Sequence, residues 1–158
     1  DKELGVSYKY PKGCDWIGAG PGSRATNMIR CYYSYMLYEP LNFSYSQRSD
    51  FKNLSIKEIA EIYYNLNKQN SQNEASQRFI SNLEQRDING YEAYQFVADK
   101  FFDAPCLEDH LKTCIGTSLE DHTNVFIFIS DGQKKMLIRI PNSDPISAKI
   151  LSTLTFVN

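Results

Sequence analysis

The most constraining feature of this sequence is the stretch of residues 124–156. It contains two apolar runs, Val125–Ile129 and Met136–Ile140, on either side of the turn-forming pair Asp131-Gly132. Glycine adopts positive φ at no steric cost, so this pair favours a tight hairpin between two strands. The first run is apolar at every position, which is typical of a strand that is covered on both faces.

A helix is predicted directly after this hairpin. Asp144 can cap its first turn, and Pro145 suits the first helical position because the missing N–H is not needed there. Apolar side chains then recur at helical spacing, at Ile146, Ile150, Leu151 and Leu154. We expect this stripe to pack against the sheet.

The earlier part of the chain adds strands and one more helix. Strands are predicted at residues 4–10, 28–38, 76–87 and 91–102, with a helix as the rival interpretation of the last range. The pair Asn89-Gly90 predicts a tight hairpin before that last range.

A capping box marks the start of the other helix. Ser55 and Glu58 have the required spacing, and an apolar stripe follows them. We expect this helix to fray near residues 67–70 and residues 71–73 to form a linker. Strands joined by hairpins, with helices laid on the outside, predict an α+β fold: an antiparallel sheet flanked by helices.

Length and charge narrow the class of protein. The 158 residues suit a single domain, 1–158, with a cysteine-bearing insertion at about residues 103–123. The net charge of −2 gives no electrostatic reason to expect a nucleic-acid partner. The opening Asp1-Lys2-Glu3 resembles the start of a processed chain, so membrane attachment is expected only through a removed leader or lipid anchor.

The four cysteines suit two disulfides and an oxidising compartment. Cys14 with Cys31, and Cys106 with Cys114, are the favoured pairs because the members of each pair are near in sequence. The alternative is four reduced thiols in a cytosolic protein. Three connectivities are open to four cysteines.

The insertion also carries both histidines, which raises a metal alternative. Cys106, His110 and Cys114 are spaced by four and would share one face of a helix, with His122 as a fourth ligand. Two thiolates and two imidazoles suit tetrahedral zinc. This arrangement excludes a Cys106–Cys114 disulfide, because the ends of a two-turn helix are about 12 Å apart. The disulfide with no cofactor is the simpler interpretation.

Tyrosines raise a third hypothesis. Tyr33 and Tyr35 lie in the predicted strand 28–38, which is rich in tyrosine. Such side chains combine apolar area with a polar tip, so they could line a groove for a glycan or a peptide. The alternative is an ordinary sheet core. If this strand lies at a sheet edge, it could also pair with an extended partner.

Nothing in the sequence predicts catalysis. The chain lacks the Gly-x-Ser-x-Gly nucleophile elbow, and the cysteines that a Cys–His dyad would need are those assigned to disulfides. We therefore name no catalytic residues and expect a binding module rather than an enzyme.

Three fragments resemble PsbP-like proteins. Residues 5–13, Gly-Val-Ser-Tyr-Lys-Tyr-Pro-Lys-Gly, resemble the opening strand and turn of that family, roughly Gly-Phe-Ser-Phe-x-Tyr-Pro-x-Gly-Trp. Residues 88–94 resemble its mid-chain hairpin, and residues 146–156 resemble its closing helix and terminal phenylalanine. Cys14 stands where the family has tryptophan, and the insertion at 103–123 is not a family hallmark.

This resemblance implies an α/β/α sandwich related in fold to the photosystem II subunit PsbP. It also implies an exported, often lipid-anchored bacterial protein, located outside the cytoplasm, with an accessory or binding role toward a protein or envelope partner. The family shares no site residues, so the resemblance assigns none to this chain.

Overall fold

The computed structural model describes residues 5–17, 27–31, 34–40, 51, 53–73, 79–99 and 123–157. In chain order its elements are β1 (Val6–Ser7), β2 (Asp15–Ile17), β3 (Asn27–Cys31), β4 (Ser34–Pro40), α1 (Ile56–Asn73), β5 (Glu84–Ile88), β6 (Tyr91–Ala98), β7 (Asn124–Ser130), β8 (Lys135–Pro141), α2 (Pro145–Leu151) and β9 (Thr155–Phe156). Neither helix in these ranges combines the length and hydrophobicity that a membrane span requires.

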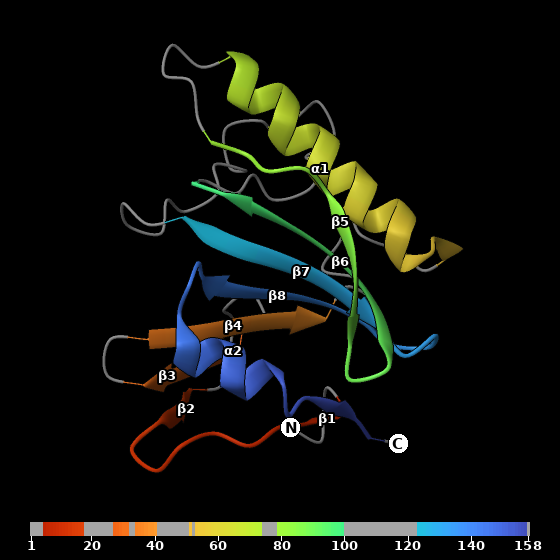
Figure 1. Cartoon of the computed structure of the whole chain (residues 1–158). Helices are drawn as coiled ribbons and strands as arrows, with labels where there is room; N and C mark the ends of the chain where they lie inside the picture. Colours follow the sequence, from red (N-terminus) through yellow and green to blue (C-terminus); the bar gives the residue numbers. More distant parts are fainter. Residues whose placement is uncertain are drawn as a thin grey trace.

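Seven strands form one sheet in the order β2-β3-β4-β8-β7-β6-β5, and β1 pairs with β9 in a second, two-stranded sheet. Every pairing is antiparallel. Helix α1 lies against β6 and β7, and α2 lies against β4 and β8 (Figure 1). Because the two helices contact alternate residues of the central strands, they cover opposite faces. The predicted α+β fold, an antiparallel sheet flanked by helices, is confirmed.

The central hairpin β7–β8 shows why its first strand is apolar throughout. Phe126 and Phe128 pack in the core beneath α1, whereas Ile127 and Ile129 pack in the core beneath α2. Both faces of β7 are therefore covered, as predicted. The connection is longer than a tight two-residue turn, because Ser130 is the partner of Lys135 and residues 131–134 lie between them.

The core beneath α1 is largely aromatic. Tyr63 lies 5.1 Å from Phe128 between ring centroids, and Phe96 stacks on Phe126 at 5.5 Å. The predicted capping box is present, with Ser55 N–H donating to Glu58 Oε2 at 2.7 Å and Glu58 N–H donating to Ser55 Oγ at 3.2 Å.

Helix α1 is longer than predicted. The expected fraying at 67–70 and the linker at 71–73 are wrong, because the helix continues to Asn73. Asn67 is buried, and its side-chain amide donates to the carbonyl of Tyr63 at 2.7 Å. A hydrogen bond back onto the preceding turn lets this asparagine continue the helix.

Helix α2 begins as predicted, with Asp144 as its N-cap and Pro145 in its first turn. Ile150 and Leu154 are buried in the core beneath α2, although Leu154 lies beyond the end of the helix. Ile146 is 37% exposed, so its place in the predicted apolar stripe is wrong. Ser147 occupies the buried position of that turn instead.

Several strand boundaries differ from prediction. The expected strand 28–38 is two strands, β3 and β4, which pair with each other so that Cys31 is opposite Ser34. The expected strand 4–10 is reduced to Val6–Ser7, because Gly5 has a φ of +61° and Lys9 bonds through its backbone to the hydroxyl of Thr153 rather than to a strand.

The two strands around Asn89-Gly90 form the predicted tight hairpin. Ile88 is opposite Tyr91, and Asn89 and Gly90 both have positive φ. The expected strand 76–87 begins only at Glu84, with Ile80 forming an isolated bridge to Ala98. β6 is a strand, so the rival helix is wrong.

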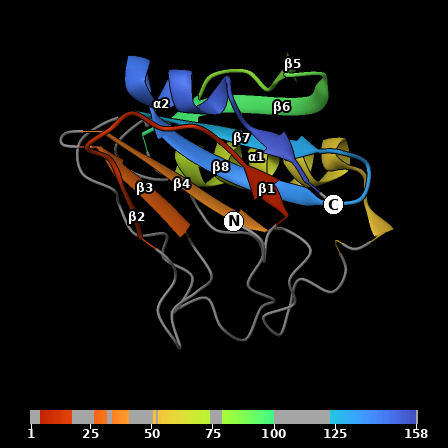
Figure 2. The same cartoon turned by 90° about the horizontal axis from the view of Figure 1, so that it is seen from below.

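β5 and β2 are the two edges of the large sheet. β5 is almost entirely exposed, and its charged side chains include Glu84 and Arg86, which form an ion pair. Charge on an exposed edge strand discourages unwanted pairing with other strands. Figure 2 shows the other pair of strands, β1 and β9, side by side near the C-terminus.

Residues 99–123 join β6 to β7, which are adjacent, with Ala98 opposite Asn124. The predicted insertion at 103–123 falls in this connection. Apart from Thr123, it lies outside the described residues.

Candidate functional site

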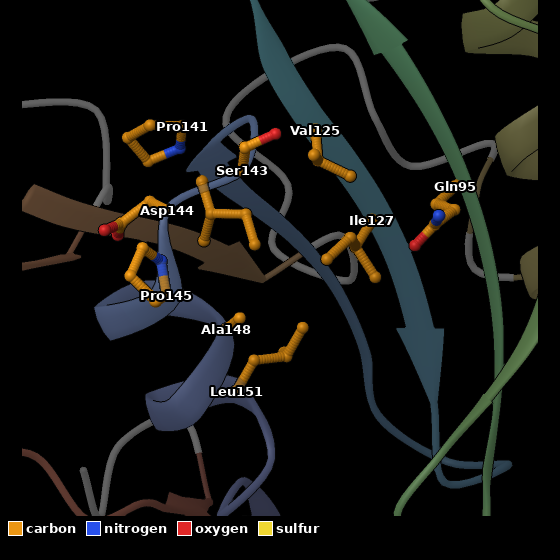
Figure 3. Close-up of a pocket in the computed structure, with 10 residues that line it drawn as sticks. Gln95, Val125, Ile127, Pro141, Ser143, Asp144, Pro145, Ala148 and Leu151 are labelled. Carbon is orange, nitrogen blue, oxygen red and sulfur yellow. The ribbon is translucent and has the colours of Figure 1, made fainter.

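A groove of about 380 Å³ lies between α2 and the neighbouring strands (Figure 3). It is open to solvent and mainly apolar. Its lining comes from β6, β7, β8, the turn before α2 and α2 itself: Gln95, Val125, Ile127, Ile140, Pro141, Ser143, Asp144, Pro145, Ala148 and Leu151.

The groove exists because α2 lies over β4 and β8 and leaves the same face of β6 and β7 without a helix. Ile127 and Ile140 are buried and form its floor. Val125, on the β7 side, and Leu151, on the α2 side, are half-buried (Figure 3). Apolar side chains therefore line both walls and remain accessible.

The turn before α2 forms the end of the groove. Ser143 has a φ of +63°, which reverses the chain after β8. The Asp144 carboxylate accepts hydrogen bonds from the N–H groups of Ile146 at 3.3 Å and Ser147 at 2.8 Å. This carboxylate is thus engaged in capping the helix.

Gln95 is the polar side chain on the strand side of the groove. It is opposite Ile127 in the ladder, so the two side chains share the face that α2 partly covers. Its side-chain amide makes no hydrogen bond to any other described residue. An amide offers both donors and an acceptor, which match the N–H and C=O of a peptide group.

None of the residues predicted from the sequence to form a site lines this groove. The available signal was the pattern of β6, in which Gln95 is the polar member of a row with Ala93 and Val97. A polar residue in an otherwise apolar row indicates that the row is incompletely covered. The position of α2, which completes the groove, is a tertiary feature.

One of the two predicted disulfides lies within the described residues. Cys14 and Cys31 form a disulfide, the first of the two favoured pairs, so the reduced-thiol alternative does not apply to them. Cys31 is 2% exposed in the core beneath α2, and Cys14 packs against that core. The bond joins the residue just before the edge strand β2 to the last residue of β3.

The remaining candidate residues are mostly outside the described part of the chain. Cys106, His110, Cys114 and His122 all lie there, so neither the second disulfide nor the zinc alternative is tested. Within the described ranges, no three side chains of histidine, cysteine, aspartate or glutamate are grouped to hold a metal ion.

The tyrosine hypothesis stays a prediction. Tyr33 lies outside the described residues, and Tyr35 is the β4 partner of Arg30 in β3. Both strands are interior to the sheet. The condition for pairing with an extended partner, that residues 28–38 lie at a sheet edge, is therefore not met.

Among the residues that the structure describes, Glu58 and Tyr94 have clearly shifted pKa values, and neither lines the groove. Hydrogen bonds from the backbone N–H and hydroxyl of Ser55 lower the pKa of Glu58. Burial raises the pKa of Tyr94, and its hydroxyl, which donates to Glu92 Oε1 at 2.9 Å, adds to the effect. Glu58 caps the start of α1, and Tyr94 lies in the core beneath α1.

Comparison with protein-family models gave no match, and no curated protein matches the sequence. A solved structure does match: the solution structure of cyanobacterial PsbP (CyanoP) from Synechocystis sp. PCC 6803. The TM-score is 0.53 at 13% sequence identity, and the match covers 99% of this chain and 89% of that chain. The chain therefore has a PsbP-like fold. At this identity, the likeness concerns the fold alone.

Proposed function

We propose that this chain is a non-enzymatic, exported accessory module that binds an apolar segment of a protein partner of the cell envelope in the groove beside α2. The observation that carries the proposal is the combination of accessible apolar walls with a single amide, Gln95, that no described residue engages.

The shape of the groove favours a protein segment over a small molecule. Small-molecule sites typically bury 70–90% of the ligand in a concave pocket. This groove is open to solvent between the strands and α2, so it suits a chain segment laid into it. The apolar walls would accept side chains, and the amide of Gln95 would bond to one peptide group of the bound segment.

The compartment in this proposal rests on the disulfide and the fold. Disulfides such as Cys14–Cys31 persist in oxidising compartments, outside the cytoplasm. A PsbP-like fold is compatible with that location. Export, bacterial origin and a removed lipid anchor are expectations from the family resemblance, and they belong to the same proposal.

The test fills the groove without disturbing the core. Ala148 is exposed on the groove side of α2, so Ala148→Trp would place an indole between the two walls. Lys149→Trp is the matched control, because the adjacent Lys149 is also exposed but does not line the groove. Peptides selected from a displayed random library on the unmodified protein are then measured against both variants.

The expected result is a set of peptides rich in apolar residues that lose at least about tenfold in affinity for the Ala148→Trp variant and keep their affinity for the Lys149→Trp variant. Gln95→Leu, which keeps the volume but removes the amide, should weaken the same peptides. Peptides that bind all variants equally, or a selection that yields none, would overturn the proposal.

A further inference from the structure

The turn between β5 and β6 is fastened to the end of α2 by one side chain. The Nδ2 of Asn89 donates to the carbonyl of Leu151 at 3.1 Å and to the carbonyl of Leu154 at 2.9 Å. These bonds span more than sixty residues of sequence, and they join the hairpin turn to the segment that closes the core beneath α2.

The chemistry of this contact requires an amide. The last carbonyls of a helix have no partner inside the helix. The carbonyl of Leu151 accepts the N–H of Leu154 at 3.0 Å as well as the amide of Asn89, and Leu154 itself lies beyond the end of the helix. Asn89 supplies its two amide N–H groups to two carbonyl oxygens. A carboxylate at the same position would bring only acceptors, and it would repel both carbonyls.

The same asparagine is followed by Gly90. An asparagine before a glycine is especially prone to deamidation, because glycine has no side chain to shield its backbone nitrogen from the asparagine side chain. In that reaction the Gly90 nitrogen loses its proton and bonds to the Cγ of Asn89. The Nδ2 leaves as ammonia, and one water then opens the cyclic imide to aspartate or isoaspartate. The reaction needs no cofactor and no oxidant.

We propose that Asn89 is a deamidation site whose conversion releases the end of α2 from the β5–β6 turn. Leu154 is fully buried and Leu151 lines the groove, so the release loosens the packing at the end of the helix and alters one wall of the groove. The consequence for partner binding rests on the proposed function, whereas the release itself does not.

The folded turn restrains this reaction. The N–H of Gly90, the attacking group, donates to Asp87 Oδ1 at 2.9 Å, and the leaving amide is held by its two carbonyls. Conversion therefore requires the turn to open. Once it has occurred, the original contact cannot form again, so the change is one-way.

The experiment follows amide exchange at the end of α2. The N–H groups of Ser152, Thr153 and Leu154 bond to carbonyls of the helix, so their exchange reports how firmly this end is held. Asn89→Asp imitates the product. Asn89→Gly removes both donors while suiting the positive φ, and Asn82→Asp adds the same charge at an exposed position without a described side-chain partner.

Exchange at these three amides should become at least about tenfold faster in the Asn89→Asp and Asn89→Gly variants and stay unchanged in Asn82→Asp. Protein aged at mildly alkaline pH should gain the acid at Asn89, by peptide mass spectrometry, and the converted fraction should exchange fast. Unchanged exchange in the Asn89 variants, or aged folded protein that keeps its amide, would overturn the proposal. Neither readout uses a partner, so a failed peptide selection leaves this proposal standing.

Discussion

Lys135, the first residue of β8, donates from its Nζ to the carbonyl oxygen of Phe51 at 3.2 Å and also bonds to the carbonyl of Leu54. These bonds fix the segment before α1 to the central hairpin. Lys135→Met keeps the aliphatic stem but removes the donors, so it should lower the free energy of unfolding by about 1–2 kcal/mol. Urea unfolding measures the change.

The control for this variant is Lys57→Met, because Lys57 is exposed on α1 and its ion pair within the described ranges is with Glu61, one turn along the helix, at 3.8 Å. An exposed ion pair of this kind should change stability by less than about 0.5 kcal/mol. Equal effects of the two variants would show that Lys135 does not fasten α1 to the sheet.

The capping box predicts a specific pH dependence. The folded pKa of Glu58 is lowered, chiefly by the backbone N–H of Ser55. A lowered folded pKa means that the ionised carboxylate adds stability above the unfolded value of about 4.5, and that this stability is lost as the pH falls through the folded pKa. Glu58→Gln should therefore remove the part of the pH dependence of unfolding free energy that comes from this carboxylate.

The measurement is urea unfolding between about pH 3 and about pH 7, for the unmodified chain and for Glu58→Gln. The two stability curves should differ most near neutral pH and converge at the acid end. Glu61→Gln removes a carboxylate from the same helix outside the capping box, and it should leave the slope near that of the unmodified chain. Parallel curves for Glu58→Gln would contradict the predicted role of the cap.

The disulfide makes a larger contribution. Cys14 and Cys31 are separated by 17 positions, and closing a loop of this size stabilises a fold by roughly 3 kcal/mol in the chain-entropy model. The double variant Cys14→Ser/Cys31→Ser should lose about this much, measured by thermal and urea unfolding. Adding a thiol reductant should affect the double variant less than it affects the unmodified chain. A double variant as stable as the parent would sink the prediction.

The aromatic core predicts the cost of a cavity. Phe128 is fully buried, with Tyr63 and Phe96 beside it. Phe128→Ala should therefore cost about 3–5 kcal/mol in the free energy of unfolding. Phe79 is 53% exposed, so Phe79→Ala should stay within about 0.5 kcal/mol of the parent. Comparable losses in the two variants would indicate that the core is arranged differently.

The parts of the fold that sequence predicted are those with local signals. Asp144 caps α2 through its own side chain, and Asn89-Gly90 supplies the positive φ that a tight turn needs. The apolar run of β7 reflects burial on both faces. Each of these features is encoded within a few residues, so the sheet and its flanking helices could be predicted.

The predictions that were wrong concern features that depend on tertiary contacts. Residues 28–38 have β-forming side chains throughout, and nothing in that pattern marks the reversal between Cys31 and Ser34. The polar end of α1 continues because Asn67 is buried against its own helix. The groove depends on where α2 lies over the sheet, so no residue pattern within β6 alone could define it.

The pairing of Ala98 with Asn124 has a consequence for how proteins with this fold could diverge in sequence. The two ends of segment 99–123 are anchored one strand spacing apart, roughly 5 Å, on strands that are already joined along their whole length. Lengthening a loop between fixed ends costs only about 0.6 kcal/mol for each doubling. We therefore expect the sheet to tolerate changes in the length and sequence of segment 99–123, including changes that add a binding site there, without a change of fold.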